Sequence, residues 1–303
     1  MAVVINTNVD SLKIQSLLTN STSKMSQAMQ RMSSGLKILN AKDDAAGTVI
    51  SAKMQVQLNG NKIAQTNVQN ANALLSTAEG NLDVIQDNMT RIRDLTLQAK
   101  NGTYSSDEIQ AMQDEVSQRM KEIDRINQSA EYSSLKLFGG TELADGATFQ
   151  VGADYGESNT ISTDTTLFEA VNFSAMTGVT STNFNLTGFD KAAKTKFTSA
   201  PTGIDNINDC KNDYDVAIKA LDAAISKITD KKSEIGSVGN RMDSALSTLT
   251  TQYENLSSAK SIITDADVAA EASNFTQQQI LQQVSTSLLA QANQAPSIAL
   301  SLI

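Results

Sequence analysis

Apolar and small residues recur along much of the chain at steps that alternate between four and three residues. The most regular series covers residues 71–99, which is four heptads. A spacing of 3.5 residues is typical of helices that pack as coiled coils. The sequence therefore predicts a helix here with a seam formed by Ala71, Leu75, Ala78, Leu82, Ile85, Met89, Ile92, Thr96 and Ala99.

Three further series predict helices in the same way. The first has Leu18, Thr22, Met25, Met29, Met32, Leu36 and Leu39. The second ends before Tyr132 and has Ile109, Met112, Val116, Met120 and Ile123. The third has Tyr214, Ile218, Leu221, Ile225, Ile228, Lys232, Ile235, Gly239, Met242, Leu246, Leu249, Tyr253 and Leu256. Lys232 and Gly239 interrupt that last seam, so we expect the packing to change there. A helix over 214–260 would be roughly 70 Å long at 1.5 Å per residue, which predicts a rod.

The middle of the chain has a different composition from its flanks. Aromatic residues are absent before Tyr104, and most of them lie between Phe138 and Phe197, among many Thr, Gly and Asn residues. Aromatic and β-branched residues favour strands, while Gly and Asn favour turns. The sequence thus predicts a mainly α fold, a long coiled-coil rod with a small β-rich insert over 141–205.

The two ends, 1–40 and 265–303, carry almost no charge in places. Leu281, Val284 and Leu288 fall on one face of a helix, and Ser, Thr, Gln and Asn fill much of the rest. Burial of two such helices against each other cannot offset the conformational entropy of ordering them. We therefore expect neighbouring chains to hold the ends folded.

Charge and composition exclude several classes of function. The net charge of −9 argues against nucleic-acid partners and against anionic membrane surfaces. The chain has no His and one Cys, Cys210, which excludes a structural zinc site and a His-based nucleophilic mechanism. We expect no enzyme activity, no metal and no cofactor. Cys210 is interpreted as a small residue before the C-terminal rod, or else as an exposed thiol able to cross-link chains.

Short matches to catalytic or metal motifs are better explained structurally. The stretch 21–24 matches S-x-x-K but lacks the companion motifs, and we interpret it as a polar helix face. The stretch 205–209 lacks the Gly and the closing Glu of a calcium loop, so we expect a capping loop. The first residues lack a basic segment, and no stretch approaches about 20 apolar residues. Any export is expected to avoid a cleaved signal peptide.

Ordered motifs at both ends carry a family resemblance. At the N-terminal end they are 4–8, RMSSGLKI at 31–38, NAKDDAAG at 40–47, 69–71, 77–80 and 122–126; at the C-terminal end they are 235–241, 280–283 and 289–294. Over about the first 140 and the last 90 residues, the chain resembles bacterial flagellin. The middle matches only generically, at 149–153. Met32, Ile303 and Cys210 depart from the usual pattern.

The resemblance implies a structural subunit of the flagellar filament, located outside the cell. It would be exported unfolded through the flagellar type III apparatus and would fold on assembly. Residues 1–42 and 265–303 would pair into the helical polymer core that lines the filament channel. Residues 43–140 and 206–264 would form the rod domain, and 141–205 would decorate it without a separate outer domain.

The resemblance also implies partners. These are other flagellin subunits, the export apparatus, the filament cap, the hook-junction proteins and a secretion chaperone, which would hold the face of Leu281, Val284 and Leu288. Two alternatives remain open: a hook–filament junction protein, and a coiled-coil scaffold unrelated to flagella. Flagellins with a protease insert need His ligands, which this chain lacks.

A host-receptor site is a further implication of the resemblance. The residues that match those read by the vertebrate Toll-like flagellin receptor are Arg91, Leu95 and Glu115. With Met89 at heptad position a, Arg91 falls at c and points outward, whereas Leu95 falls at g and flanks the seam. The alternative is structural: Leu95 widens the apolar stripe, and Arg91 and Glu115 are solvated charges.

Overall fold

The computed structural model describes residues 8–178, 184, 186 and 214–300, with 295–300 described by their backbone. The chain divides into two compact units. Unit 1 combines the residues up to Asn59 with those from Gln252 onward, and unit 2 is Gly60–Thr251. Cys210, for which two roles were considered, and the predicted capping loop at 205–209 lie outside the described residues. Among the described residues, no helix combines the length and hydropathy that a membrane span requires.

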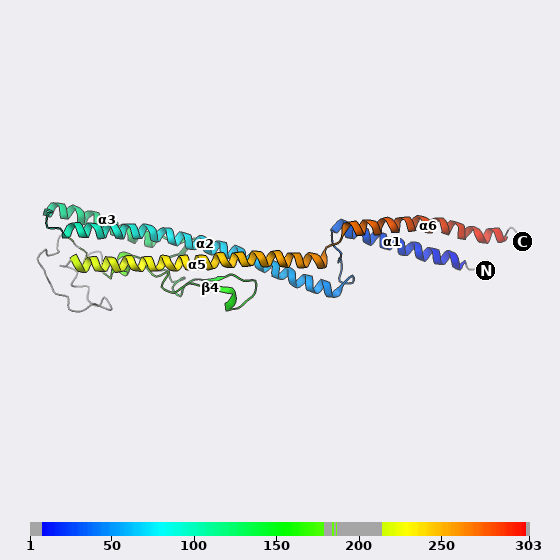
Figure 1. Ribbon diagram of the computed structural model, residues 1–303, viewed down its shortest axis with the longest axis horizontal. Coiled ribbons are helices and arrows are strands. Elements are labelled where there is room, and N and C mark those ends of the chain that lie inside the picture. The colour runs from blue at the N-terminus through cyan, green and yellow to red at the C-terminus, as the bar shows by residue number, and fades with distance from the viewer. Residues whose placement is uncertain (1–7, 179–183, 185, 187–213, 301–303) are drawn as a thin grey trace. The chain divides into compact units, whose positions relative to one another are not determined.

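Helices account for most of the described structure, as predicted (Figure 1). The elements in chain order are α1 (Val9–Ser34), α2 (Ala45–Lys100), α3 (Ser106–Ser129), β1 (Glu131–Tyr132), β2 (Leu135–Lys136), β3 (Thr148–Gln150), the 3-10 helix η1 (Glu157–Asn159), β4 (Thr160–Ser162), α4 (Phe173–Thr177), α5 (Tyr214–Thr264) and α6 (Val268–Leu300). Both α2 and α5 run from one unit into the other. The predicted division into core, rod and insert is a functional one and stays a prediction.

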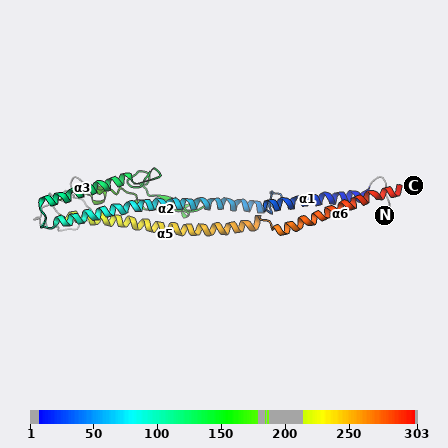
Figure 2. The same ribbon diagram turned by 90° about the horizontal axis from the view of Figure 1, so that it is seen from above.

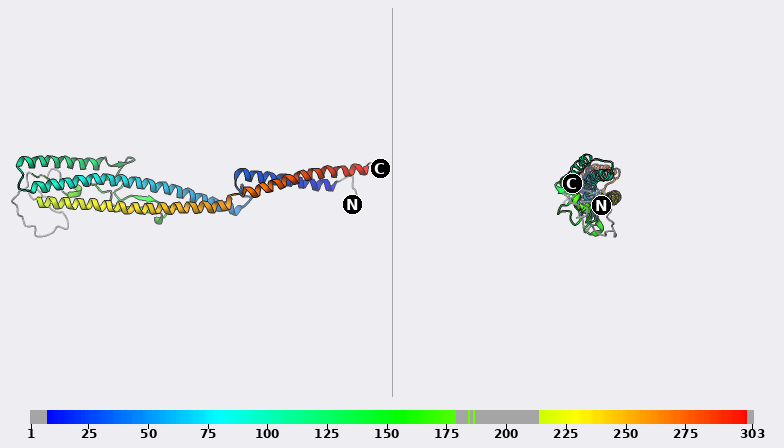
Figure 3. Two further views of the ribbon diagram at one scale, coloured as in Figure 1. Left: turned by 45° about the horizontal axis from the view of Figure 1, so that its top comes forward. Right: turned by 90° about the vertical axis from the view of Figure 1, so that its left-hand side faces the viewer.

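Helices α3 and α5 run alongside α2 in unit 2 (Figures 2 and 3). Four polar pairs connect α2 and α5. From one pair to the next, the residue number rises on α2 and falls on α5 by the same amount, so the antiparallel register is constant. These pairs are Asn72–Asp243, Asp83–Lys232, Arg93–Asp222 and Lys100–Asp215. At the start of α3, Ser105 and Glu108 form a reciprocal capping box, which closes the turn after α2.

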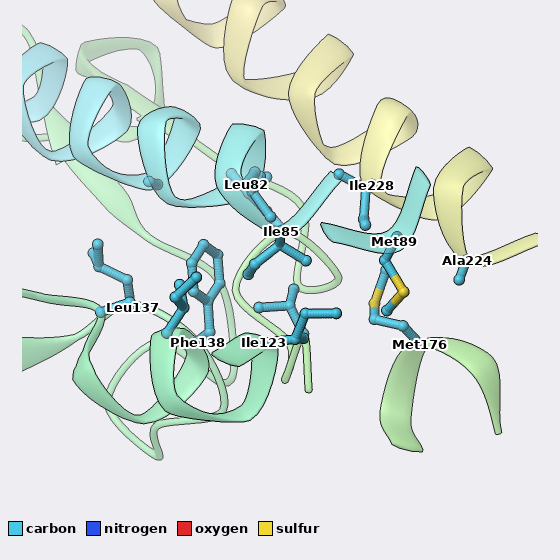
Figure 4. Packing of buried hydrophobic residues seen from close by; sticks show 14 of the residues in the cluster. Leu82, Ile85, Met89, Ile123, Leu137, Phe138, Met176, Ala224 and Ile228 are labelled. Atoms are coloured by element: carbon cyan, nitrogen blue, oxygen red, sulfur yellow. The ribbon is translucent and has the colours of Figure 1, made fainter. Parts of the chain in front are cut away.

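The predicted seam of α2 is confirmed, because every one of its nine positions between Ala71 and Ala99 is buried. The polar member, Thr96, is satisfied within the helix: its hydroxyl donates to the Ile92 carbonyl at 2.7 Å. Figure 4 shows Leu82, Ile85 and Met89 of α2 gathered with Ile123 of α3 and Ile228 of α5. One apolar cluster thus joins the three helices of unit 2.

The predicted seam of α5 is wrong at four positions in its first half, and the predicted Tyr253 near its end is exposed. Ile218, Ile225, Lys232 and Gly239 lie beside the seam, and the buried residues are Ala217, Ala224, Lys231 and Val238. The heptad steps are kept, but these positions shift by one residue. Ala217 and Ala224 are buried in the seam, and the larger Ile225 packs against the apolar cluster from beside it.

The predicted series in the first 40 residues is also corrected. Helix α1 ends at Ser34 because Gly35 adopts a left-handed conformation, φ 71°, and its N–H caps the Arg31 carbonyl at 2.8 Å. Leu36 and Leu39 therefore lie beyond the helix. Within α1 the most buried residues are Ser21 and Ala28. The predicted Leu18, Met25 and Met32 are partly buried, while the predicted Thr22 and Met29 are exposed.

The insert has less strand than its composition predicted. In the described residues it forms one short antiparallel ladder, β3 with β4, in which Phe149 pairs with Ile161. The second ladder, β1 with β2, directly precedes the insert. The aromatic residues mostly fill the core: Phe173 and Phe184 meet edge to face at 5.4 Å, and Phe138 and Phe168 are buried. The small β insert is confirmed, with irregular backbone as its main component.

A row of charged residues on α5 holds the backbone of the insert. Lys231 is 8% exposed, and its ammonium group donates to the carbonyls of Thr166 and Leu167, the latter at 3.0 Å. One turn further, Glu234 accepts from the Asp164 N–H at 2.6 Å. Burial lowers the pKa of Lys231 below its ordinary value of 10.5. The lysine thus occupies the seam as an anchor for the insert.

Removal of this anchor should destabilise unit 2. We expect Lys231→Ala to lower the free energy of unfolding by about 1–3 kcal/mol, because two carbonyls lose their donor. Lys232→Ala is the matched control. Its side chain is 30% exposed, and its ammonium group lies 2.5 Å from Asp83 and donates to the Gln86 amide oxygen at 3.0 Å. A pair that keeps this much contact with water contributes about 0–1 kcal/mol. Urea denaturation of both variants checks this, and equal losses would contradict the assignment of Lys231 to the seam.

Candidate assembly surface and the face shared by α2 and α3

Helices α1 and α6 pair antiparallel in unit 1 and lie side by side (Figures 1 and 3). At one end the Asn8 amide donates to the Ala292 carbonyl at 2.8 Å. At the other end Arg31 and Glu271 form an ion pair at 3.2 Å. Beside that pair, Leu36 and Asp265 bridge the two connecting segments. Polar contacts therefore fix the register of this pair.

The side of α6 that α1 covers contains few strongly apolar residues. Its partly or fully buried positions keep the heptad steps of four and three: Glu271, Phe275, Gln278, Gln282, Ser285, Leu289 and Ala292. On α1 the buried residues are Ser21 and Ala28. Among the described residues of unit 1, the buried apolar side chains are those of Ala28 and Leu58 alone. The two helices consequently fully bury no large apolar side chain between them.

The larger apolar side chains of α6 are exposed. We define the assembly face as Ile280, Leu281, Val284 and Leu288, which are between 42% and 55% exposed. The predicted residues Leu281, Val284 and Leu288 all lie on it. A shallow groove follows this face toward the N-terminal half of α6, lined by Ala272, Ser273, Thr276, Gln277, Ile280 and Leu281.

Unit 1 exposes further apolar residues that the sequence analysis missed. Val9, Leu12 and Leu17 on α1 and Val49, Ile50 and Val56 at the start of α2 are all exposed. None of these six residues belongs to a predicted heptad series, and their apolar character was the available signal. Exposed apolar side chains gathered in one unit indicate contacts with other molecules.

Charge is nearly absent from α6. Glu271 is the one ionisable side chain from 268 to 303, and it is paired with Arg31. The assembly face therefore presents a neutral surface, even though the whole chain carries a net charge of −9. Copies of such a surface can approach each other without electrostatic repulsion.

Arg91 and Glu115 meet on the face shared by α2 and α3. The Arg91 Nε and Nη2 atoms donate to the two Glu115 carboxylate oxygens at 2.9 and 3.1 Å. Arg119, which the sequence analysis did not select, donates to the same carboxylate at 3.0 Å and to the Asn88 amide oxygen at 3.0 Å. Arg119 is one turn after Glu115, and that i,i+4 spacing was the available signal.

This network favours the ionised form of Glu115. Hydrogen bonding from Arg91 lowers the pKa of Glu115 below its ordinary value of 4.5. The stability that the pair contributes is therefore present above that ordinary value and is lost as the pH falls through the lowered pKa. The side chains are 42% and 36% exposed, so the contribution is small.

Leu95 differs from the two charged residues because its side chain is buried. It is 2% exposed and belongs to the apolar cluster of unit 2. The structure thus brings Arg91 and Glu115 together at the surface and places Leu95 in the core. In the described residues, no three acidic or Cys side chains gather as metal ligands.

Comparison with known proteins gives the family. Residues 5–143 match the model of the bacterial flagellin N-terminal helical region, and residues 218–303 match that of the C-terminal helical region. A flagellin of Bacillus subtilis is 34% identical over 309 residues, covering 99% of both chains. A flagellin of Xenorhabdus nematophila is 35% identical over 326 residues, covering all of both chains. The chain belongs to the bacterial flagellin family.

Membership in the flagellin family makes this chain a structural subunit that polymerises into the flagellar filament. A solved structure assigned to a flagellar hook-associated protein of Vibrio parahaemolyticus has a TM-score of 0.54 and 15% identity, covering 73% of this chain and 99% of that one. At that identity the likeness shows a shared fold alone. The predicted filament subunit is confirmed.

The burial of Leu95 leads to a stability prediction for this flagellin. Leu95→Ala should cost about 2–5 kcal/mol of unfolding free energy, as is usual for a leucine lost from a packed core. Leu97→Ala is the matched control on the same helix, because Leu97 is 41% exposed. Its change should stay within about 0.5 kcal/mol. Chemical denaturation measures both, and an equally small effect of Leu95→Ala would show that the site is not packed.

Proposed function

We propose that the assembly face is where a subunit contacts its neighbours in the filament. The observation that carries this proposal is the distribution of apolar residues in unit 1, where many large apolar side chains are exposed and the fully buried residues of α1 and α6 are small or polar. The ordering cost of α1 and α6 is then offset by burial between subunits. Residues 1–42 and 265–303 form the polymer core that lines the channel, residues 43–140 and 206–264 form the rod domain, and 141–205 decorate that rod domain.

The assembly face can be tested with a pair of matched valines. Val284 in α6 and Val84 in α2 are 47% and 48% exposed, and both lie inside helices. We expect Val284→Ser to raise the subunit concentration needed for polymerisation about fivefold, because roughly 1 kcal/mol of apolar burial is lost at each contact. Val84→Ser should polymerise as the parent does.

Light scattering and electron microscopy of seeded assemblies give the readout for both variants. Circular dichroism of the monomers should show unchanged helix content, since neither side chain is buried in the monomer. Normal polymerisation of Val284→Ser, or equal defects in both variants, would remove Val284 from the subunit contact.

The same face serves the subunit before assembly. In this proposal the chain is exported unfolded through the flagellar type III apparatus, without a cleaved signal peptide, and folds as it joins the filament outside the cell. A secretion chaperone covers Leu281, Val284 and Leu288 until then, because an exposed apolar helix aggregates. The filament cap and the hook-junction proteins are the remaining partners. The scarcity of buried apolar residues in unit 1 supports this, because such a unit gains little from folding alone.

A second proposed role is recognition of the monomer by the vertebrate Toll-like flagellin receptor. Arg91 and Glu115 are the accessible members of the predicted site, and their bidentate pair presents a fixed charged surface. Leu95, which follows Arg91 by one helical turn and is buried in the apolar cluster, acts as a positioning residue.

Receptor recognition is tested in reporter cells with purified monomer. Arg91→Ala should weaken the response several-fold, because arginine is one of the residue types that most often carry the binding energy of an interface. Arg93→Ala is the matched control: Arg93 is similarly exposed but pairs with Asp222 of α5. Unchanged helix content should accompany both variants. A silent parent protein, or an Arg91→Ala variant as potent as the parent, would leave Arg91 as rod surface only.

A further inference from the structure

Two Asn-Gly dipeptides occur in the sequence, Asn59–Gly60 and Asn101–Gly102. In such a pair the backbone nitrogen of the glycine can attack the Asn side-chain carbonyl carbon, because glycine has no Cβ to obstruct the approach. A five-membered imide forms, and the side-chain nitrogen leaves as ammonia. Water then opens the imide to Asp or to isoaspartate. The net change consumes one water, releases one ammonia and needs no oxidant or enzyme.

The structure places Asn101–Gly102 in the short turn between α2 and α3 (Figure 2). Helix α2 ends at Lys100, and both residues of the dipeptide are exposed. The Asn101 N–H still donates to the Gln98 carbonyl at 3.0 Å, but the hydrogen bonds of the described chain include none from the Gly102 N–H. A Cβ added to Gly102 would meet nothing within 4 Å. Within the described residues the attacking nitrogen therefore has no hydrogen-bond partner, and the space beside the Gly102 Cα is open.

The other dipeptide is held in place on both sides. Asn59 and Gly60 lie in the interior of α2, where the Gly60 N–H belongs to the helical hydrogen-bond ladder. The Asn59 amide oxygen accepts from the Gln55 side chain at 2.8 Å. A Cβ on Gly60 would lie 2.7 Å from that of Ala153, so this glycine is packed against the insert. Attack here requires local unfolding of the helix.

We propose that Asn101 is a site of spontaneous deamidation in the folded subunit, whereas Asn59 is protected by its helix. The modification adds one negative charge directly after the C-terminal end of α2. Helix carbonyls already carry partial negative charge there, and the neighbouring Lys100 is paired with Asp215. The isoaspartate product also adds one backbone atom to the turn that leads into α3. Subunits modified in this way form a more acidic population with an altered α2–α3 turn.

The test incubates the full-length folded protein in mildly alkaline buffer and follows both dipeptides by peptide mapping with mass spectrometry. We expect the Asn101 peptide to convert at least about tenfold faster than the Asn59 peptide. In protein unfolded with urea the two should convert at similar rates. Gly102→Ala should slow the conversion of Asn101 by a similar factor, because the added methyl group obstructs the nitrogen. That variant fits without strain, since space around Gly102 is open.

Three results would overturn the proposal. One is an Asn101 that stays intact in the folded protein while it converts in urea. Another is equal conversion of Asn59 and Asn101 in the folded protein. The third is a Gly102→Ala variant that converts as fast as the parent. Far-UV circular dichroism before and after incubation confirms that α2 remains folded, so the comparison between the two sites reports their local structure.

Discussion

The antiparallel packing of α2 against α5 determines where the other elements of unit 2 can lie. Small residues such as Ala78, Ala217 and Ala224 are buried at the seam, and four polar pairs keep the register from Asn72 to Lys100. Once that pair is fixed, α3 and the insert pack on it, and Lys231 binds the backbone of the insert. The insert thus follows the surface that the helices provide.

The same heptad geometry has a different outcome in unit 1 because the residues at the seam differ. Where unit 2 buries Leu82, Ile85 and Ile92, the α1–α6 seam holds Ser21, Ala28 and Ser285. Such a seam can align two helices but excludes little apolar surface from water. Many large apolar residues of unit 1, among them Ile280, Leu281 and Val284, are exposed instead. For a subunit that polymerises, this arrangement leaves much of the hydrophobic driving force to be realised in the filament.

The helix content and the α2 seam were predictable. Over four heptads of α2, the apolar and small residues all fall on one face of the helix, so only that face could be the seam. The α5 seam was not predictable, because Ile218 and Ile225 are more apolar than Ala217 and Ala224, and periodicity cannot distinguish a close contact from its flank. Gly35 ended α1 before Leu36 for a conformational reason that the heptad pattern does not contain. Leu281, Val284 and Leu288 were found because they share a helix face. The burial of Leu95 depends on three helices meeting, and this is a tertiary property.

The scarcity of charged residues on α6, compared with α2, α3 and α5, follows from the exposure of its apolar residues. A long helix with many exposed apolar residues would ordinarily need charged neighbours to stay dispersed, yet α6 has Glu271 alone, and that residue is paired. A charge placed among Leu281, Val284 and Leu288 would have to be desolvated, or would face its own copy, when subunits pack. Neutrality is therefore compatible with the assembled state and unfavourable for the free one. The charges that keep the subunit dispersed must then lie elsewhere, as the surface pairs of α2, α3 and α5 do.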